Sequence, residues 1–413
     1  MVEHEEEIKD IVVHKGLENI YVDQTDICDI DGKNGQLWYR GYPIDELVEK
    51  STFEETAYLV LYGKLPTQPE LDEFSQELMA ERNIPDNILT FMKSFPRNTT
   101  RIELLRTAIS ALSLYDPDDY DYSQEANCRK GIRIIAKMPT IIAFAHRIEE
   151  NLKLVEPRTS DLSLAANFFY MMTGRIPTVE VEKAFDKLLI CHADHGVNAS
   201  TFAARVTVST LSDIYSGIVS AIGALRGPLH GGANERVVKF LLHEVKKKEN
   251  VIPWAAAKLT NKELIMGFGH RVYKTWDPRA IIIRDISKSF YELRQNACFD
   301  YACGEIIDPE AVDNTIHAEH DPDIDDLFEM TEILTDYMIK TKNLYPNVDL
   351  YSGGLLHALG VPSPIFTPLF AAARSVGWVA HSIEQLSNNR LIRPRLLYTG
   401  QNGKIYVPIE ERE

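Results

Sequence analysis

Four short segments of this chain combine glycine with histidine or aspartate, residue types that can move protons or stabilise a developing charge. Each segment also has a purely structural interpretation, as a solvated loop, a helix cap or an aspartate at the edge of the core. Which interpretation holds depends on the elements that position these residues. The segments are 192–198 with His192 and His195, 227–234 with His230, 267–274 with His270, and 346–354 with Asp349.

His230 lies between two helical patterns, in the sequence Gly-Pro-Leu-His-Gly-Gly-Ala-Asn of residues 227–234. Apolar residues recur at helical spacing from residue 237 onward, which predicts a helix over 233–248. Glycines beside a histidine let another backbone or a ligand approach, and the amides at a helix start favour an anion or an oxyanion. His230 is therefore either a turn histidine before a surface helix or part of an oxyanion site.

Arg374 stands in an apolar stretch, 370–378, within a helix expected over 363–389. A buried guanidinium is costly unless it is paired, and no acid lies within helical reach before Glu384. A guanidinium binds carboxylates through two parallel hydrogen bonds. Either an acid distant in the sequence pairs with Arg374, or the site awaits an anionic ligand.

Three further patterns point to metal or dinucleotide sites, and each meets an objection. His192 and His195 have the spacing of metal ligands, but no glutamate lies between them and no third ligand is evident. The Gly-Phe-Gly sequence at 267–269 is too short for a dinucleotide fingerprint, and no strand precedes it. A second metal candidate lies in the acidic stretch 304–326, which is typical of a solvated surface loop. Its possible ligands are His317, His320, Asp321, Asp323 and Asp325.

The composition is that of a soluble cytoplasmic protein. Of 413 residues, 45% are hydrophobic and 25% are charged, and the net charge of -17 argues against binding to nucleic acid or an anionic membrane. An anionic ligand must then be held by locally gathered arginines. Segment 1–10 has no apolar signal core, and no apolar run has transmembrane length. The cysteines are scattered and odd in number, which favours reduced thiols: Cys28, Cys128, Cys191, Cys298 and Cys303.

Turn and helix signals predict a nearly all-helical fold, with enough chain for one large or two to three ordinary domains. Residues 16–45 are expected to be extended, because Asp31-Gly32 and Asn34-Gly35 are hairpin turn signals. Helices are predicted over 52–63, 68–81, 86–94, 100–115, 124–150, 160–173, 178–193, 199–211, 212–226, 233–248, 253–260, 278–295, 324–343, 351–359 and 363–389.

Taken together, these segments resemble citrate synthase, and the likeness runs through residues 16–400. Three long motifs carry it: 227–234, then 267–274 leading to Asp277-Pro278-Arg279, then Pro346-Asn347-Val348-Asp349. The compact length is similar to the short form found in archaea and bacteria, as is the sequence Tyr-Arg-Gly-Tyr at 39–42. Supporting matches are His192-Ala193-Asp194-His195, Asn198-Ala199-Ser200-Thr201, Arg374 and Arg393-Pro394.

The resemblance implies a condensation, in which the methyl group of acetyl-CoA loses a proton, its carbon adds to the ketone of oxaloacetate, and the citryl thioester is hydrolysed. It implies that Asp349 is the base, that His230 donates to the thioester carbonyl, and that His270 protonates the ketone oxygen. An aspartate is too weak a base for this methyl group unless charge on oxygen is stabilised, which agrees with these roles. The implied oxaloacetate contacts are His195, Arg279, Arg374 and, from a partner subunit, Arg393. The implied coenzyme A contacts are Gly267, Phe268, Gly269, Arg271 and Lys274.

The family's architecture implies a large helical domain formed by residues 1–230 and 359–413, with an inserted small helical domain, 231–358. Closure of the two domains over the active site is expected to exclude water. A homodimer is part of the expected mechanism, because Arg393 is implied to act across the subunit interface. The expected reaction needs no metal and no permanently bound cofactor, since the coenzyme A thioester is a substrate.

Two departures from the family pattern and three alternative functions stay open. Many short-form relatives have an acidic residue after the histidine that matches His195, where this chain has Gly196. Stretch 296–326 is longer than usual, and is either an extended loop or a binding segment. 2-Methylcitrate synthase, which uses propionyl-CoA, shares the same residues, and one methylene is worth only about 1–3 kcal/mol of discrimination. A non-catalytic paralogue is the second alternative, although the intact histidines and aspartate argue against it. A metal-binding protein based on residues 317–325 is the third.

Overall fold

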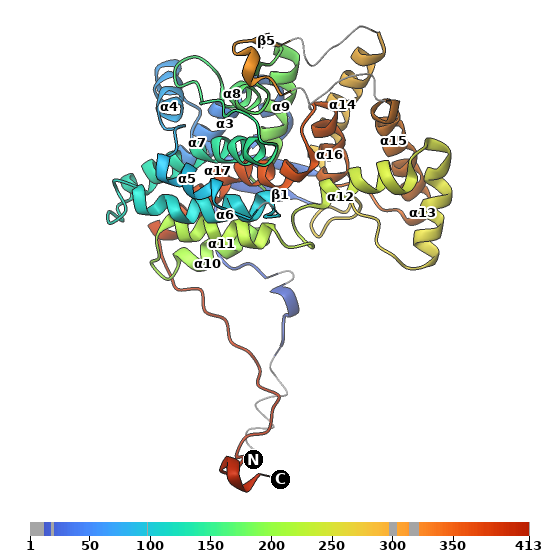
Figure 1. The fold of residues 1–413 in the computed structure, drawn as a ribbon. Coiled ribbons are helices and arrows are strands. Elements are labelled where there is room, and N and C mark those ends of the chain that lie inside the picture. The colour runs from blue at the N-terminus through green and yellow to red at the C-terminus, as the bar shows by residue number, and fades with distance from the viewer. Residues whose placement is uncertain (1–11, 18–19, 97, 297–303, 314–321, 413) are drawn as a thin grey trace.

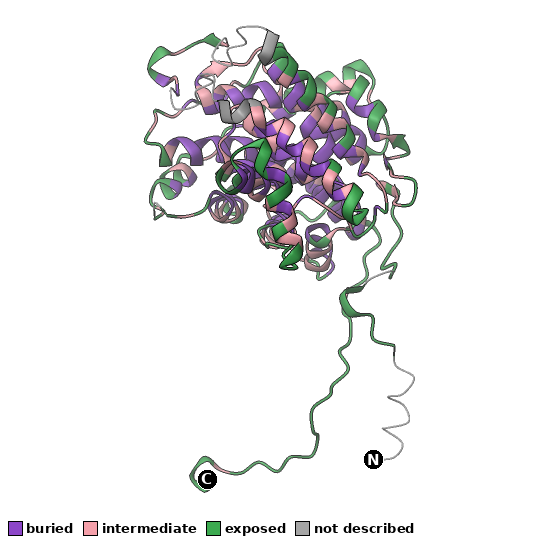
Figure 2. Ribbon diagram, turned by 90° about the vertical axis from the view of Figure 1, so that its right-hand side faces the viewer, coloured by how far each residue is buried: buried purple, intermediate pink, exposed green. Residues whose placement is uncertain are grey.

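The computed structural model describes residues 12–17, 20–96, 98–296, 304–313 and 322–412. Helices account for most of these residues and the strands are short, so the predicted all-helical fold class is confirmed (Figure 1). Buried residues lie on the helix faces that point into the body, and exposed residues lie on its outside (Figure 2). The helices are thus amphipathic, as their sequence periodicity predicts.

The N-terminal part of the chain is extended, as predicted, and forms a three-stranded antiparallel sheet in the order β1–β2–β3. The strands are β1 (Cys28–Asp31), β2 (Gln36–Tyr39) and β3 (Tyr42–Pro43). Asp31 pairs with Gln36, so the first turn falls on the two glycine signals at 32–35. One short helix, α2 (Ile44–Lys50), directly follows Pro43 and was not predicted from the sequence.

The larger group of helices is built around α7 (Gln124–Glu149) and α17 (Phe366–Ser387), in which most residues are buried. The two helices meet closely at Gly131, where a Cβ atom would lie 2.3 Å from a methyl carbon of Val379. The surrounding helices are α3 (Phe53–Tyr62), α4 (Gln68–Ala80), α5 (Asp86–Lys93), α6 (Arg101–Leu112), α8 (Leu164–Thr173), α9 (Val179–His192), α10 (Ala199–Val208) and α11 (Ile214–Leu225).

A second group of helices lies at one side of the molecule in Figure 1 and belongs to residues 231–358, the expected small domain. The prediction of a single α-helix over 233–248 is wrong in its second half. The backbone is π-helical after Lys239, and the helix stops before Lys246, which has φ of 66°. The elements are α12 (Ala233–Lys239), a π-helix (Phe240–Val245), α13 (Val251–Thr260), α14 (Pro278–Asn296), α15 (Pro322–Lys342) and α16 (Val348–Ala358).

The surface loop predicted for 304–326 is only partly confirmed by residues 304–313, because most of them are exposed or half-buried but the segment also forms a strand and buries Asp313. Strand β5 (Glu305–Ile306) pairs antiparallel with β4 (Arg175–Ile176), which follows α8. Asp313 is almost fully buried, and its carboxylate lies 3.1 Å from His146 Nε2. The acidic pattern misleads here because a buried acid finds its partner far away in the sequence. Cys298, Cys303, His317 and His320 lie outside the described residues.

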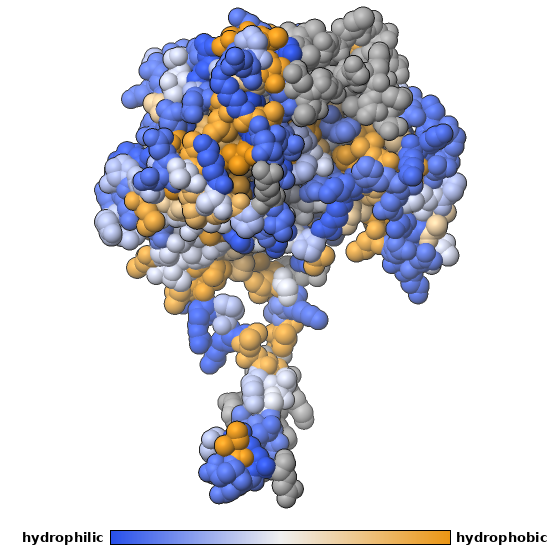
Figure 3. All heavy atoms as spheres, viewed as in Figure 1, coloured by the Kyte–Doolittle hydropathy of each residue, from blue (hydrophilic) through white to orange (hydrophobic). Residues whose placement is uncertain are grey.

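The described segments next to the two termini, 12–17 and 390–412, project from the side of the body that carries α10 and α11 (Figures 1 and 2). Between α17 and a short 3-10 helix (Ile409–Glu411) the chain forms neither helix nor strand. Apolar side chains gather on the surface where these tails leave the body (Figure 3). Among the helices of the described residues, none has the length and apolar character needed to cross a membrane.

Candidate active site

His230 lies in the turn between α11 and α12, and its ring is held by Ser200 near the start of α10. The Ser200 N–H donates to His230 Nε2 at 3.3 Å, and the Ser200 hydroxyl oxygen lies 2.8 Å from the same nitrogen. A backbone N–H can only donate, so Nε2 accepts and the proton of the neutral ring is assigned to Nδ1. The Nδ1–H of His230 is thus left to donate to another group.

The turn that carries His230 depends on Gly231, since a Cβ atom there would lie 2.2 Å from the carbonyl oxygen of Leu225. Burial lowers the pKa of His230 to about 4, and the charge of Arg374 acts in the same direction, so the ring is neutral at pH 7. Helix α12 has only seven residues, so its dipole is a minor influence on His230. The contacts to Ser200 orient the ring and decide which of its nitrogens can donate. A half-buried, oriented ring of this kind differs from a solvated turn histidine.

His270 is held in the opposite tautomer by its own loop. Its Nδ1 accepts from the N–H groups of Val272 at 3.0 Å and Tyr273 at 3.2 Å. The neutral ring therefore carries its proton on Nε2, which can donate. Burial lowers the pKa of His270 to about 4, and Arg279 contributes to the shift.

His195, His270 and Tyr273 form a compact group of rings. The ring centres of His195 and His270 lie 5.1 Å apart, and those of His270 and Tyr273 lie 4.8 Å apart. The Tyr273 hydroxyl lies 3.2 Å from His195 Nε2, and burial holds the pKa of His195 well below its ordinary value. Gly196 has φ of 56° and donates its N–H to Asp194 at 3.1 Å, so glycine suits the turn that follows His195.

Arg279 is buried at the start of α14 and is already paired with Asp277. Its Nε and Nη2 donate to the two carboxylate oxygens of Asp277 at 3.0 and 2.7 Å. Burial alone would raise the pKa of Asp277, but Arg279 holds it below its ordinary value. Asp277 also accepts from the Val348 N–H at 3.3 Å, so one carboxylate joins the start of α14 to the start of α16. A substrate carboxylate can use only the remaining N–H groups of Arg279.

Asp349 is the second residue of α16, and in the described part of the chain no group donates a hydrogen bond to its carboxylate. Asn347 caps α16 by accepting from the Asp349 N–H at 3.1 Å, which explains why the helix begins before the predicted residue 351. Burial raises the pKa of Asp349 to about 6, against the opposing charges of Arg279 and Arg374. The carboxylate is therefore ionised at pH 7 and more basic than an ordinary aspartate.

Arg374 is buried, and none of the described residues forms an ion pair with it. Its Nε donates to the carbonyl oxygen of His192 at 2.7 Å, and its guanidinium lies 4.8 Å from the ring centre of Phe370. Burial lowers its pKa, which reflects the cost of holding this charge inside the protein. Pairing with a distant acid does not account for Arg374, so an anionic ligand is the interpretation to test.

The loop that carries His270 packs against the segment that precedes α16. Phe268 pairs with Pro346 in an isolated β-bridge, and the Gly269 N–H donates to the Tyr345 carbonyl oxygen at 2.9 Å. Gly267 has φ of 90°, and a Cβ atom there would lie 2.7 Å from the side chain of Leu350. The two glycines thus have a structural role, since they let the two segments approach.

Arg271 and Lys274 are exposed on the outer side of the same loop. Lys274 Nζ donates to the Arg271 carbonyl oxygen at 3.2 Å, and the Lys274 N–H donates to the Gly32 carbonyl oxygen at 2.8 Å. The second contact joins the loop to the turn between β1 and β2. The two cations lie on an accessible surface, where phosphate groups could reach them.

Arg393 is not part of this group of residues. It lies exposed in the segment after α17, where the Ile392 N–H donates to Ser209 Oγ at 3.1 Å. Ser209 directly follows α10, whose ten residues span about 15 Å from the end that contacts His230. Within one chain, the site and Arg393 therefore lie near opposite ends of α10.

In the described ranges, no group of three or more histidine, cysteine, aspartate or glutamate side chains is arranged to hold a metal. The buried His192 ring donates from Nδ1 to the Leu188 carbonyl oxygen at 2.8 Å, within α9. His192 is thus a residue of the helical core, in contrast to His195. The second metal candidate, 317–325, lies outside the residues whose side chains are described.

Three residues that orient the site have no role assigned from the sequence, namely Ser200, Tyr273 and Asp277. The role of Asp277 could have been predicted from the sequence, because an acid two positions before an arginine can form an ion pair with it. Ser200 had no such signal, since it lies thirty positions from His230 and only the fold brings the two together.

The arrangement combines a carboxylate of raised pKa, two neutral histidine donors of opposite tautomer and buried arginines. A base of this kind can remove a proton, the histidines can stabilise charge that develops on oxygen, and the arginines can bind carboxylates. The fold and the site thus define a helical protein in which a base, two hydrogen-bond donors and cations that could bind carboxylates are held by one scaffold.

The chain belongs to the citrate synthase family. The sequence model of that family, described as citrate synthase, C-terminal domain, matches residues 16–395. Citrate synthase 2 of Bacillus subtilis is 45% identical over 400 residues, which cover 96% of this chain and 99% of that protein.

A solved relative and a relative of different name complete the comparison. The Thermoplasma acidophilum citrate synthase, solved as a ternary complex with carboxymethyl coenzyme A and oxaloacetate, is 35% identical with a TM-score of 0.86. That match covers 97% of this chain and 100% of the other. 2-Methylcitrate synthase of Mycobacterium tuberculosis is 37% identical over 393 residues, which cover 95% of this chain and 92% of that protein.

Proposed function

We propose that this chain condenses acetyl-CoA with oxaloacetate and water to give citrate and coenzyme A. The observation that carries the proposal is the Asp349 carboxylate, which has no hydrogen-bond donor in the described part of the chain and a pKa raised to about 6. Family membership supports the reaction, and so does the relative solved with carboxymethyl coenzyme A and oxaloacetate. We place the reaction in the tricarboxylic acid cycle and in the cytoplasm.

In the proposed mechanism, Asp349 removes a proton from the acetyl methyl group while His230 Nδ1–H donates to the thioester carbonyl oxygen. The methyl carbon then forms a bond to the ketone carbon of oxaloacetate, and His270 Nε2–H supplies the proton that the ketone oxygen takes up. Water hydrolyses the citryl thioester and releases the coenzyme A thiol. Each histidine thus stabilises one oxygen at the moment when it gains charge.

The neutral state of both histidines supports this assignment. With pKa values of about 4, both rings are uncharged at the pH where Asp349 is ionised. A protonated, positively charged imidazole ring beside Asp349 would stabilise its ionised carboxylate. The pKa of Asp349 would then be lower, and the carboxylate would be a weaker base. Neutral donors leave the carboxylate available to the methyl proton.

Oxaloacetate is proposed to bind through His195, Arg279 and Arg374 of one subunit and Arg393 of its partner in a homodimer. The apolar tail that follows Arg393 supports a second subunit, because it does not pack on its own chain. Its most exposed apolar side chains are Leu396 at 99%, Ile405 at 89% and Tyr406 at 79% exposure.

The thioester substrate is proposed to bind along the loop 267–274, with Arg271 and Lys274 facing its phosphates. Residues 231–358 are proposed to move as one small domain that closes over the bound substrates. The packing of that loop against residues 345–347 supports this proposal, because it makes His270 and Asp349 move together.

The second candidate is 2-methylcitrate synthase, which the Mycobacterium tuberculosis relative favours. Thiol release from acetyl-CoA and from propionyl-CoA, each with and without oxaloacetate, separates the possibilities. Faster, oxaloacetate-dependent release from acetyl-CoA is the expected result. Preference for propionyl-CoA would support the second candidate, and no release from either thioester would leave a non-catalytic paralogue.

A further inference from the structure

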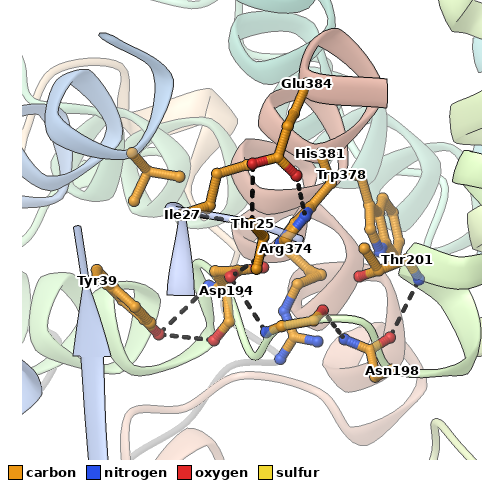
Figure 4. A network of polar contacts seen from close by, with 12 residues as sticks. Thr25, Ile27, Tyr39, Asp194, Asn198, Thr201, Arg374, Trp378, His381 and Glu384 are labelled. Atoms are coloured by element: carbon orange, nitrogen blue, oxygen red, sulfur yellow. Dashed lines mark hydrogen bonds and ion pairs between the residues drawn. The ribbon is translucent and has the colours of Figure 1, made fainter. Parts of the chain in front are cut away.

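A series of charged side chains runs from the active site along one face of α17 and is buried except at its outer end; Figure 4 shows its inner part, from Arg374 to Glu384. Within it, the Asp194 carboxylate lies 3.3 Å from His381 Nε2, and His381 Nδ1 lies 3.7 Å from the carboxylate of Glu384. Arg205 joins Glu384 to the N-terminal segment, with contacts of 2.7 Å on both sides. Positive and negative groups alternate along the series, which consists of Arg374, Asp194, His381, Glu384, Arg205 and Asp23.

Asp194 occupies the position between the two cations of α17. Gly377 makes room for it, because a Cβ atom at that position would lie 2.3 Å from Asp194 Oδ1. Arg374 and His381 stand two helical turns apart, one on either side of this glycine. The carboxylate contacts the imidazole but forms no ion pair with the guanidinium.

The pKa shifts of His381 and Asp194 also indicate that these two groups form an ion pair. Burial alone would lower the pKa of His381, but Asp194 raises it above its ordinary value, which favours the charged ring. Burial alone would raise the pKa of Asp194, and His381 holds it low. Of the charged groups around Arg374, Asp194 has the largest influence on its pKa. Asp194 is therefore the anion that could compete with a substrate for Arg374.

We propose that His381 is a positioning residue, which holds the charge of Asp194 and so leaves the Arg374 guanidinium free for a substrate carboxylate. The proposal rests on the proposed function, in which Arg374 binds oxaloacetate. Without the imidazolium, Asp194 would be a buried carboxylate with only the Gly196 N–H and the Cys28 thiol as its remaining donors. Since a buried charge seeks the nearest opposite charge, it would turn to Arg374 and mask it.

The test is His381→Gln, with the oxaloacetate KM, kcat and the oxaloacetate Kd from calorimetry as readouts. We expect KM and Kd for oxaloacetate to rise by about tenfold and kcat to change less than about twofold. The tenfold figure assumes that masking of Arg374 weakens its interaction with the substrate carboxylate by the energy of about one pKa unit. Adding Asp194→Asn to that variant removes the competing anion and should restore Kd to within about twofold of the wild type. A merely structural role predicts instead that the double variant binds no better than the single one.

The matched control is His146→Gln, which breaks another buried histidine–aspartate contact, with Asp313 at 3.1 Å. It should lower stability in the same way and leave the oxaloacetate Kd unchanged. An unchanged Kd in His381→Gln, or an equal rise in His146→Gln, would overturn the positioning role.

Titration of the wild type tests the same idea if His381→Gln does not fold. Asp194 and Glu384 act directly on the imidazole, while Arg205 and Asp23 act through Glu384. Deprotonation of His381 at alkaline pH should weaken oxaloacetate binding in the wild type and not in Asp194→Asn. The same alkaline loss in both proteins would refute the proposal.

The outcomes for the positioning role and for the proposed function are separate. A wild type that binds oxaloacetate with the expected dependence on His381 but releases no thiol would refute the reaction and keep the positioning role. A wild type that condenses the substrates but shows no effect in His381→Gln would refute the positioning role alone. Failure of the wild type to bind oxaloacetate would overturn both.

Discussion

Replacement of Asp349 by asparagine is expected to make this protein more stable and nearly inactive. The pKa of the carboxyl is raised from 3.8 to about 6 in the folded protein, mainly because of burial. A shift of about two units corresponds to about 3 kcal/mol of folding free energy at neutral pH. Because the side chain is partly accessible to water, this figure is an upper limit, and we expect a gain of about 1–3 kcal/mol.

The sign of the effect follows from proton linkage. Between pH 3.8 and about 6 the folded protein binds the Asp349 proton more readily than the unfolded chain does. The cost of the ionised carboxylate is therefore fully present above pH 6 and disappears as the pH falls toward 3.8. The stabilisation by Asp349→Asn should be largest at pH 7 to 8 and vanish below about pH 4.

Urea unfolding at pH 8 and pH 4, together with thiol release at pH 8, measures both effects. Loss of a general base should reduce kcat by about 100- to 10,000-fold. Asp277→Asn is the matched control, because that carboxylate has a lowered pKa and holds Arg279, so its loss should destabilise the fold. A less stable Asp349→Asn variant at pH 8, or one with activity near that of the wild type, would refute the reasoning.

Three further predictions concern the same site. In the wild type, kcat should fall as the pH drops through about 6, because Asp349 is then protonated, and a flat profile from pH 5 to 8 would count against this base. Arg374→Lys should raise the oxaloacetate KM by about tenfold or more, since lysine cannot form the two parallel hydrogen bonds of a guanidinium, and an unchanged KM would argue against the contact. Subunits carrying Arg393→Ala and His230→Ala should each be inactive alone and recover activity in mixed dimers, because one site per dimer is then intact. No recovery on mixing would contradict a shared site.

The general fold could be predicted from the sequence because its signals are local. Helical spacing of apolar residues predicts most of the helices, and the glycine turns at 32–35 predict the first β-turn. Prediction fails where a contact from elsewhere decides the conformation. Strand β5 forms because residues 304–313 meet β4, and no local pattern reports that pairing.

For the candidate site, too, some features could be predicted from the sequence and others could not. The sequence by itself determined the residue types that can carry the chemistry, because His230, His270 and Asp349 stand in long motifs whose order is recognisable along the chain. Arg393 was also placed from the resemblance, and its position far from the site of its own chain is compatible with a role in a partner subunit.

Only the tertiary structure decided the protonation states of these residues. The Ser200 N–H selects one tautomer of His230, and two N–H groups of its own loop select the other tautomer of His270. Burial raises the pKa of Asp349 and lowers those of both histidines. Tautomer and pKa depend on desolvation and on partners that are distant in sequence, so no motif contains them, although they decide which group can act as base and which as donor.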